Sequence, residues 1–158
     1  MSAVPEDPAP GETEIPGLSM DQFNPIVFLT GIFFFNMLSR LGMAPLLPDI
    51  ATDLAMTHSQ AGGLFFLIST GYCASLFGTI FLTFLVSHRH LIVASGLAVG
   101  TSLLFAAAGQ GVAMLQVSMV CLGLAGGCYL PSGVASLTRL VHRRHWGKVL
   151  GFHQLAPN

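Results

Sequence analysis

The feature that most constrains this chain is a run of 85 residues, positions 54–138, in which Arg89 is the only side chain with a formal charge. In the whole sequence 8% of residues are charged and 53% are hydrophobic, whereas a soluble domain carries about 25% charged residues. A water-soluble fold of this size cannot cover its surface with so few charges. We therefore expect the chain to fold with lipid as its solvent.

Four apolar segments are long enough to cross a hydrocarbon core about 30 Å thick as helices. They span residues 25–47, 60–86, 91–108 and 112–138, and a fifth begins near Trp146 but is too short to cross before position 158. Helices are expected because an open sheet edge in lipid would leave backbone groups unpaired. The sequence thus predicts an all-α integral membrane fold with four transmembrane helices and the start of a fifth.

Helix start and stop signals accompany these segments. Thr57 and Gln60 have the spacing of a capping box before the second segment. Pro48 and Asp49 are expected to end the first segment, and residues 109–111 form a Gly-Gln-Gly link between the third and fourth.

The amino-terminal residues 1–22 contain four prolines and five acids but no Lys or Arg. A secretory signal would begin basic and become apolar at once, so we predict a disordered cytoplasmic tail over 1–22 and a transmembrane domain over 23–158. The links after the first and third segments lack Lys and Arg, while those after the second and fourth contain Arg89, Arg139, Arg143, Arg144 and Lys148. The positive-inside rule then places the N-terminus and the even-numbered links in the cytoplasm.

Arg40 lies inside the first segment, where a cation costs at least about 2.5–3.5 kcal/mol at membrane depth. Asn36 is one turn earlier on the same face, and Ser39 adjoins it. One interpretation is a cavity-facing cation that meets an anionic substrate group. The other is an arginine that snorkels outward or bonds to nearby carbonyls. No side-chain carboxylate follows Asp53, so we expect the partner of Arg40 to be a carbonyl, water, a ligand or a residue outside this sequence.

Small residues recur at helical spacing and predict helix packing faces. Gly96 and Gly100 form a GxxxG pattern in the third segment, and Gly123, Gly127 and Pro131 share one face of the fourth. Such faces allow helix backbones to approach closely in lipid.

A second candidate cavity face on the fourth segment holds Tyr129, Ser132 and Ser136, roughly opposite the glycines. His153 is a titratable group in the incomplete fifth segment. Either a proton relay or a capped or cavity-facing histidine would explain it.

Other chemistries lack the residues they require. The three cysteines show no metal-ligand spacing and are interpreted as packing residues, and His142 and His145 have no companion ligands, so no metal or cofactor is expected. No nucleophile, base and orienting acid occur together, which argues against an enzyme. A net charge of −1 gives no basic field for nucleic acid.

Taken in order, three stretches resemble the amino-terminal half of a major facilitator superfamily transporter over roughly residues 24–158. They are the arginine-bearing, proline-rich NMLSRLGMAPLLPDI, the second-span start TDLAMTHSQAGGLFFLISTGYCASLFG, and the glycine-rich LGLAGGCYLPSGVASL. The inner link departs from the family pattern Gly-x-x-x-Asp-Arg-x-Gly-Arg-Arg, because FLVSHRH keeps one arginine and lacks the acid and the glycine.

The resemblance implies part of a six-helix half of a twelve-helix fold that works by alternating access, with the first and fourth spans lining the cavity. Asn36, Arg40, Tyr129 and Ser132 become cavity candidates, and His153 the proton-coupling candidate in this half. The implied partners are the lipid bilayer of a plasma (bacterial inner) membrane, a small solute that is anionic if Arg40 contacts it, and a missing carboxy-terminal half.

Two hypotheses follow. In the first, the chain is a truncated amino-terminal portion of a secondary transporter, which predicts further transmembrane sequence downstream of codon 158 and no transport by the 158-residue product alone. In the alternative, it is a self-sufficient four-span membrane subunit or scaffold that oligomerises through its GxxxG faces. Crosslinking in detergent discriminates between them, since only the alternative predicts a defined homo-oligomer.

Overall fold

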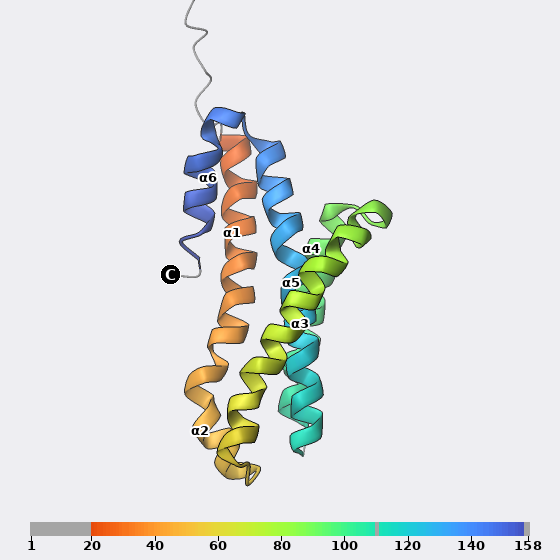
Figure 1. Cartoon of the computed structure of the whole chain (residues 1–158). Helices are drawn as coiled ribbons and strands as arrows, with labels where there is room; N and C mark the ends of the chain where they lie inside the picture. Colours follow the sequence, from red (N-terminus) through yellow and green to blue (C-terminus); the bar gives the residue numbers. More distant parts are fainter. Residues whose placement is uncertain (1–19, 110, 157–158) are drawn as a thin grey trace, which may run out of the picture.

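The structure, a computed structural model, describes residues 20–109 and 111–156. It is built from helices, with no strand among the residues described, and this confirms the all-α prediction (Figure 1). The elements are α1 (Met20–Leu41), α2 (Met43–Asp53), α3 (His58–Leu85), α4 (His88–Ala108), α5 (Val112–Leu140), the 3₁₀ turn η1 (Arg143–His145) and α6 (Trp146–His153).

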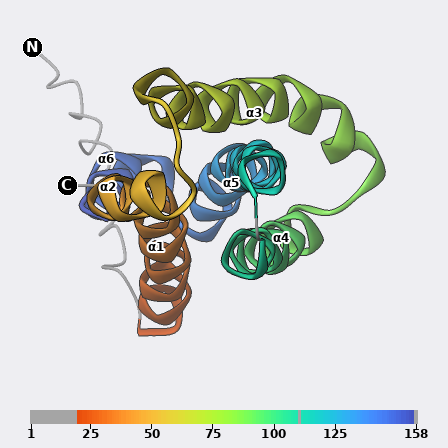
Figure 2. The same ribbon diagram turned by 90° about the horizontal axis from the view of Figure 1, so that it is seen from below.

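Helix α5 lies at the centre of the bundle, with α3 and α4 packed along it and α1 and α6 beside it (Figure 2). The described residues contain four helical spans long and apolar enough to cross a membrane, which confirms the predicted number. They are Gln22–Asp53, His58–Leu85, His88–Ala108 and Val112–Leu140.

The first span is interrupted at Gly42, between α1 and α2. A Cβ at Gly42 would lie 2.7 Å from the Leu38 carbonyl oxygen, so the backbone here is too tight for a larger residue. The predicted end at Pro48 is wrong, because Pro48 lies inside α2 and the helix continues to Asp53. Proline removes one backbone donor but leaves its own carbonyl available, and Thr52 Oγ1 donates to the Pro48 oxygen at 2.9 Å.

The other predicted boundaries lie close to the observed ones. The capping box is confirmed: the Gln60 N–H donates to Thr57 Oγ1 at 3.3 Å, and the Thr57 N–H donates to Gln60 Oε1 at 2.9 Å. Helix α1 begins at Met20, so the last residues of the expected tail are helical. The rest of that tail, residues 1–19, and the middle of the predicted 109–111 link lie outside the described residues.

Glycines bring α3 and α5 into direct backbone contact. A Cβ at Gly71 would overlap the backbone oxygen of Val120, and one at Gly123 would overlap that of Ile68. A Cβ at Gly127 would lie 2.7 Å from another backbone oxygen of α3. Gly123 and Gly127 were expected at a helix contact, whereas Gly71 was not singled out. In lipid the hydrophobic effect does not drive helices together. Close van der Waals packing of this kind therefore stabilises the bundle.

Helix α4 packs on α5 through serines rather than through its glycines. Ser95 and Ser102 are buried, and Ser95 Oγ donates to the Ala125 oxygen at 2.7 Å. Gly96 and Gly100 were expected at a packing face, and within the described part of the chain a Cβ at either would meet nothing within 4 Å. Serine is small enough for close approach and also satisfies its hydroxyl on a neighbouring carbonyl.

The links of the bundle separate into two ends (Figure 1). The α3–α4 link and the η1 turn lie at the upper end with the start of α1, and the α2–α3 and α4–α5 links lie at the lower end. The link residues that carry cations therefore share one end, as the positive-inside rule requires of a membrane protein.

Candidate functional site

Arg40, in the last turn of α1, points toward α3 and α5. Its guanidinium carbon lies 4.3 Å from the centroid of the Tyr72 ring on α3, a cation–π contact. Arg40 Nη2 also donates to Met37 Sδ at 3.0 Å. The half-buried side chain therefore contacts protein instead of extending to the end of the span.

Two buried polar atoms, one of Arg40 and one of Asn36, have no hydrogen-bond partner among the described residues. They are Arg40 Nε, a donor, and Asn36 Oδ1, an acceptor. A Cβ at Gly126 on α5 would lie 3.1 Å from Asn36 Oδ1 and 3.5 Å from Arg40 Nε. The donor and the acceptor thus converge where α5 has no side chain. Leaving such a buried group unpaired costs about 1–3 kcal/mol, so the pair is suited to a polar ligand.

Asn36 is 4% exposed and lies between this site and a groove between α1–α2 and α4. The groove has a volume of about 560 Å³, and Ser39, Gly96 and Gly100 also line it. Ser39 Oγ donates to the Asn36 backbone oxygen at 2.7 Å, so its hydroxyl serves the helix itself.

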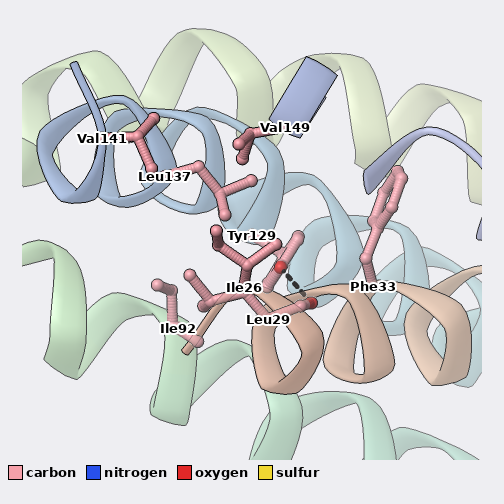
Figure 3. Packing of buried hydrophobic residues seen from close by; sticks show 8 residues of the cluster. All are labelled: Ile26, Leu29, Phe33, Ile92, Tyr129, Leu137, Val141 and Val149. Atoms are coloured by element: carbon pink, nitrogen blue, oxygen red, sulfur yellow. Dashed lines mark hydrogen bonds between the residues drawn. The ribbon is translucent and has the colours of Figure 1, made fainter. Parts of the chain in front are cut away.

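Tyr129 lies in the core of the bundle, where it is fully buried. Its hydroxyl donates to the Leu29 carbonyl oxygen at 2.6 Å, and its ring stacks on Phe33 with centroids 5.5 Å apart (Figure 3). The sequence placed Tyr129 on a cavity-lining face. The structure instead places it in the apolar cluster that joins α1, α4, α5 and α6, formed by Ile26, Leu29, Phe33, Ile92, Tyr129, Leu137, Val141 and Val149.

His153, the last residue of α6, is fully buried against the same cluster. Its ring stacks on Phe33 at 4.5 Å between centroids, and Nδ1 lies 3.5 Å from Thr30 Oγ1. Thr30 already donates its hydroxyl proton to the Ile26 oxygen at 2.8 Å. The matching tautomer therefore carries its proton on Nδ1 and leaves a lone pair on Nε2, which has no partner in the described residues.

Ser132 is fully buried, and its Oγ also has no partner among the residues described. Its backbone oxygen accepts a bond from Ser136 Oγ at 2.7 Å. Of the four cavity candidates, the structure thus brings Asn36 and Arg40 together. Tyr129 and Ser132 lie further along α5, in its buried interior.

Two residues of the Arg40 site were not singled out from the sequence. Tyr72 faces Arg40, and Gly126 provides the space beside it. A signal for Tyr72 existed, because it follows Gly71 and a glycine in a long apolar helix often marks a close helix contact. No group of three His, Cys, Asp or Glu side chains able to hold a metal ion occurs within 20–109 and 111–156.

Comparison with known proteins gives one family match. Residues 29–156, which include most of α1 and all of α2 to α6, match the model described as Major Facilitator Superfamily. No curated protein and no solved structure gives a significant match.

Proposed function

Because this chain belongs to the Major Facilitator Superfamily, we propose that it contributes the solute-contacting part of a secondary transporter for a small anionic solute. Membership makes it a multi-pass membrane protein of a transporter family, surrounded by lipid bilayer and acting on a small molecule. The proposed mechanism is alternating access, in which two repeats rock about a site near the bilayer midplane.

The observation that carries the proposal is the buried N–H of Arg40 Nε, which has no hydrogen-bond partner among the described residues. A guanidinium binds carboxylate and phosphate oxygens through in-plane N–H groups, and such charge-assisted bonds are among the strongest in proteins. The chain has no carboxylate after Asp53. We propose that an anionic group of the solute supplies the negative charge that Arg40 meets.

A purely structural role for Arg40 accounts less well than a solute-binding role for the free-energy cost of placing its charge inside the membrane. A cation at membrane depth costs at least about 2.5–3.5 kcal/mol on the mildest scale. The ring contact with Tyr72 contributes roughly 0.5–2 kcal/mol, depending on desolvation, and the Met37 sulfur is a weak acceptor. These contacts do not offset the cost, which favours a site that water or an anionic solute reaches.

His153 is the proposed proton-coupling residue of this part of the transporter. The tautomer matched to Thr30 leaves the Nε2 lone pair buried and available for a proton. Histidine is also the side chain whose charge changes most readily between about pH 5 and 8. No acid in the transmembrane helices after Asp53 competes for this role.

The proposed orientation places the cation-rich end of the bundle, with the start of α1, in the cytoplasm of a cell bounded by this inner (plasma) membrane. In folds of this kind the solute site lies where two repeats meet. The proposal therefore includes a second half that faces Arg40 and completes the cavity.

Uptake measurements on cells that express the gene with its native downstream DNA test this function. We would compare wild type, Arg40→Gln and Arg40→Lys for movement of labelled monocarboxylates, dicarboxylates and inorganic phosphate, with a neutral sugar as control. The Gln variant should lose anion transport at unchanged membrane expression, and Lys should retain only part because it lacks the planar, bidentate donor. Normal anion transport by the Gln variant would make Arg40 structural.

A second candidate function is a non-catalytic membrane subunit that associates with itself through α4. The observation in its favour is that Gly96 and Gly100 line a groove, and that a Cβ added at either would meet nothing within 4 Å in the described part of the chain. Crosslinking of the purified protein in detergent tests this alternative. A defined homo-oligomer that Gly100→Ile abolishes supports it, and heterogeneous association in both proteins contradicts it.

A further inference from the structure

The Arg40 guanidinium is held from one side by an aromatic ring on a different helix. Arg40 comes from α1 and Tyr72 from α3, and the guanidinium carbon lies over the ring at 4.3 Å. Arginine side chains are long and can extend toward a membrane surface when nothing stops them. The ring provides a surface against which the cation rests inside the bundle.

Tyr72 lies in the backbone contact between α3 and α5. It follows Gly71, whose missing side chain lets the α3 backbone touch α5. A Cβ at Gly127 would lie 2.7 Å from the Tyr72 backbone oxygen, so α5 also confines Tyr72 from that side. The ring is therefore attached to a backbone segment that cannot shift without separating α3 from α5.

We propose that Tyr72 is a positioning residue that holds the Arg40 guanidinium by its ring face and directs the in-plane N–H edge toward Asn36 and Gly126. This inference rests on the proposed function and names its ligand group as an oxyanion, a carboxylate or a phosphoryl group, bound in the guanidinium plane. All N–H groups of a guanidinium lie in its plane, and in-plane pairs with a carboxylate or phosphate are the bidentate ones. A Cβ at Gly126 would lie 3.5 Å from Arg40 Nε, so the glycine leaves that N–H without a side-chain neighbour from α5.

Labelling of Arg40 tests the positioning role without any solute. The purified protein in lipid nanodiscs is treated with phenylglyoxal, which modifies arginine, and the modified sites are read by mass spectrometry with the exposed Arg89 as reference. Wild type and Tyr72→Phe should label Arg40 at the same rate, because both keep the ring. Tyr72→Leu and Tyr72→Met should change that rate at least about fivefold, as expected for the loss of a cation–π contact.

Measurements of anion binding test whether the ligand group is an oxyanion. Dissociation constants for acetate, succinate and inorganic phosphate are measured by thermal stabilisation of the same protein, with chloride as the control anion. Tyr72→Phe should bind within about twofold of wild type, and Tyr72→Leu should bind about five- to thirtyfold more weakly. A preference for phosphate over both carboxylates identifies a phosphoryl ligand, and the reverse preference identifies a carboxylate.

The matched control is Phe66→Leu, which removes an exposed aromatic ring from the same helix. It should match wild type in labelling and binding, and monodispersity with helical circular dichroism checks the fold of each variant. Equal labelling in wild type, Tyr72→Leu and Tyr72→Met overturns the positioning role, and Tyr72→Phe behaving like Tyr72→Leu overturns the part assigned to the ring.

The two proposals fail separately. If changing Tyr72 alters labelling while Arg40→Gln binds anions as wild type does, the anion function is wrong and the positioning contact stands. If wild type binds none of the three oxyanions, the assigned ligand group is wrong, and labelling still decides the positioning role.

Discussion

The Tyr129 hydroxyl donates a 2.6 Å hydrogen bond to the carbonyl oxygen of Leu29, and so joins the central helix α5 to α1 across 100 positions of sequence. The Leu29 carbonyl lies within a helix, and a second bond to it is made possible by its remaining lone pair. Hydrogen bonds between helices in lipid contribute on average about 0.6 kcal/mol and at most about 1.7. This link fixes how α1, and with it Arg40, lies on α5.

Replacing Tyr129 by Phe should lower stability modestly and leave the Arg40 site intact. The variant keeps the ring stacked on Phe33 but loses the bond to Leu29, which should cost about 1 kcal/mol. Reversible unfolding in mixed detergent micelles measures the change. If instead the fold is unchanged and oxyanion binding is lost, Tyr129 contacts the solute and its assignment to the core is wrong.

An alanine at Gly71 should severely weaken the bundle. Its Cβ would overlap the backbone oxygen of Val120, and neither backbone can move without separating α3 from α5. Overpacking of this kind costs about 1–3 kcal/mol or more. The matched control is Gly78→Ala in the same helix, where a Cβ meets nothing within 4 Å. Melting temperatures in one detergent compare the two, and equal values would show that α3 and α5 are not in backbone contact.

Gly126→Ala should impair anion binding more than stability. The added Cβ would sit 3.1 Å from Asn36 Oδ1, which must yield by a few tenths of an ångström, and it would occupy the space beside Arg40 Nε. We expect roughly tenfold weaker oxyanion binding and a stability change below about 1 kcal/mol. Binding isotherms measured beside Gly78→Ala check this. A variant that binds as tightly as wild type would place the ligand elsewhere.

His153→Gln should remove the pH dependence of transport if His153 carries the coupling proton. The groups in contact with its ring, Thr30, Phe33 and Tyr129, bear no charge near neutral pH. Initial rates across about pH 5 to 8 give the profile, since histidine titrates in this range. A profile unchanged from wild type would leave His153 as a packing residue stacked on Phe33.

The number of spans, and the need of Arg40 for contact with protein or water, could be predicted from the sequence because each follows from a large energy. Apolar length determines which segments cross a bilayer, and a cation within such a segment must find protein or water. The capping box at Thr57 could also be predicted, because its two hydrogen bonds join residues that are three positions apart. Each of these features depends on residues that are close in the sequence, so the order of residues along the chain is enough to predict it.

The helix contacts could not be predicted because they depend on how each helix is rotated about its axis. Helices α3 and α4 are apolar on all sides, so no polar face indicates which side meets α5. Gly96 and Gly100 fit a packing pattern, yet α4 uses the face of Ser95 instead. Tyr72 was missed for the same reason, since its pairing with Arg40 depends on the relative placement of α1 and α3.

Equilibrium binding of a radiolabelled oxyanion to wild type and Arg40→Gln, purified side by side in nanodiscs, tests the central claim most directly. The account predicts saturable binding to wild type that falls about 10- to 150-fold in the Gln variant, the loss expected for hydrogen bonds to a charged group. Both proteins should show the same helical content and monodispersity. Equal affinity of the two proteins for every oxyanion that wild type binds would contradict the account.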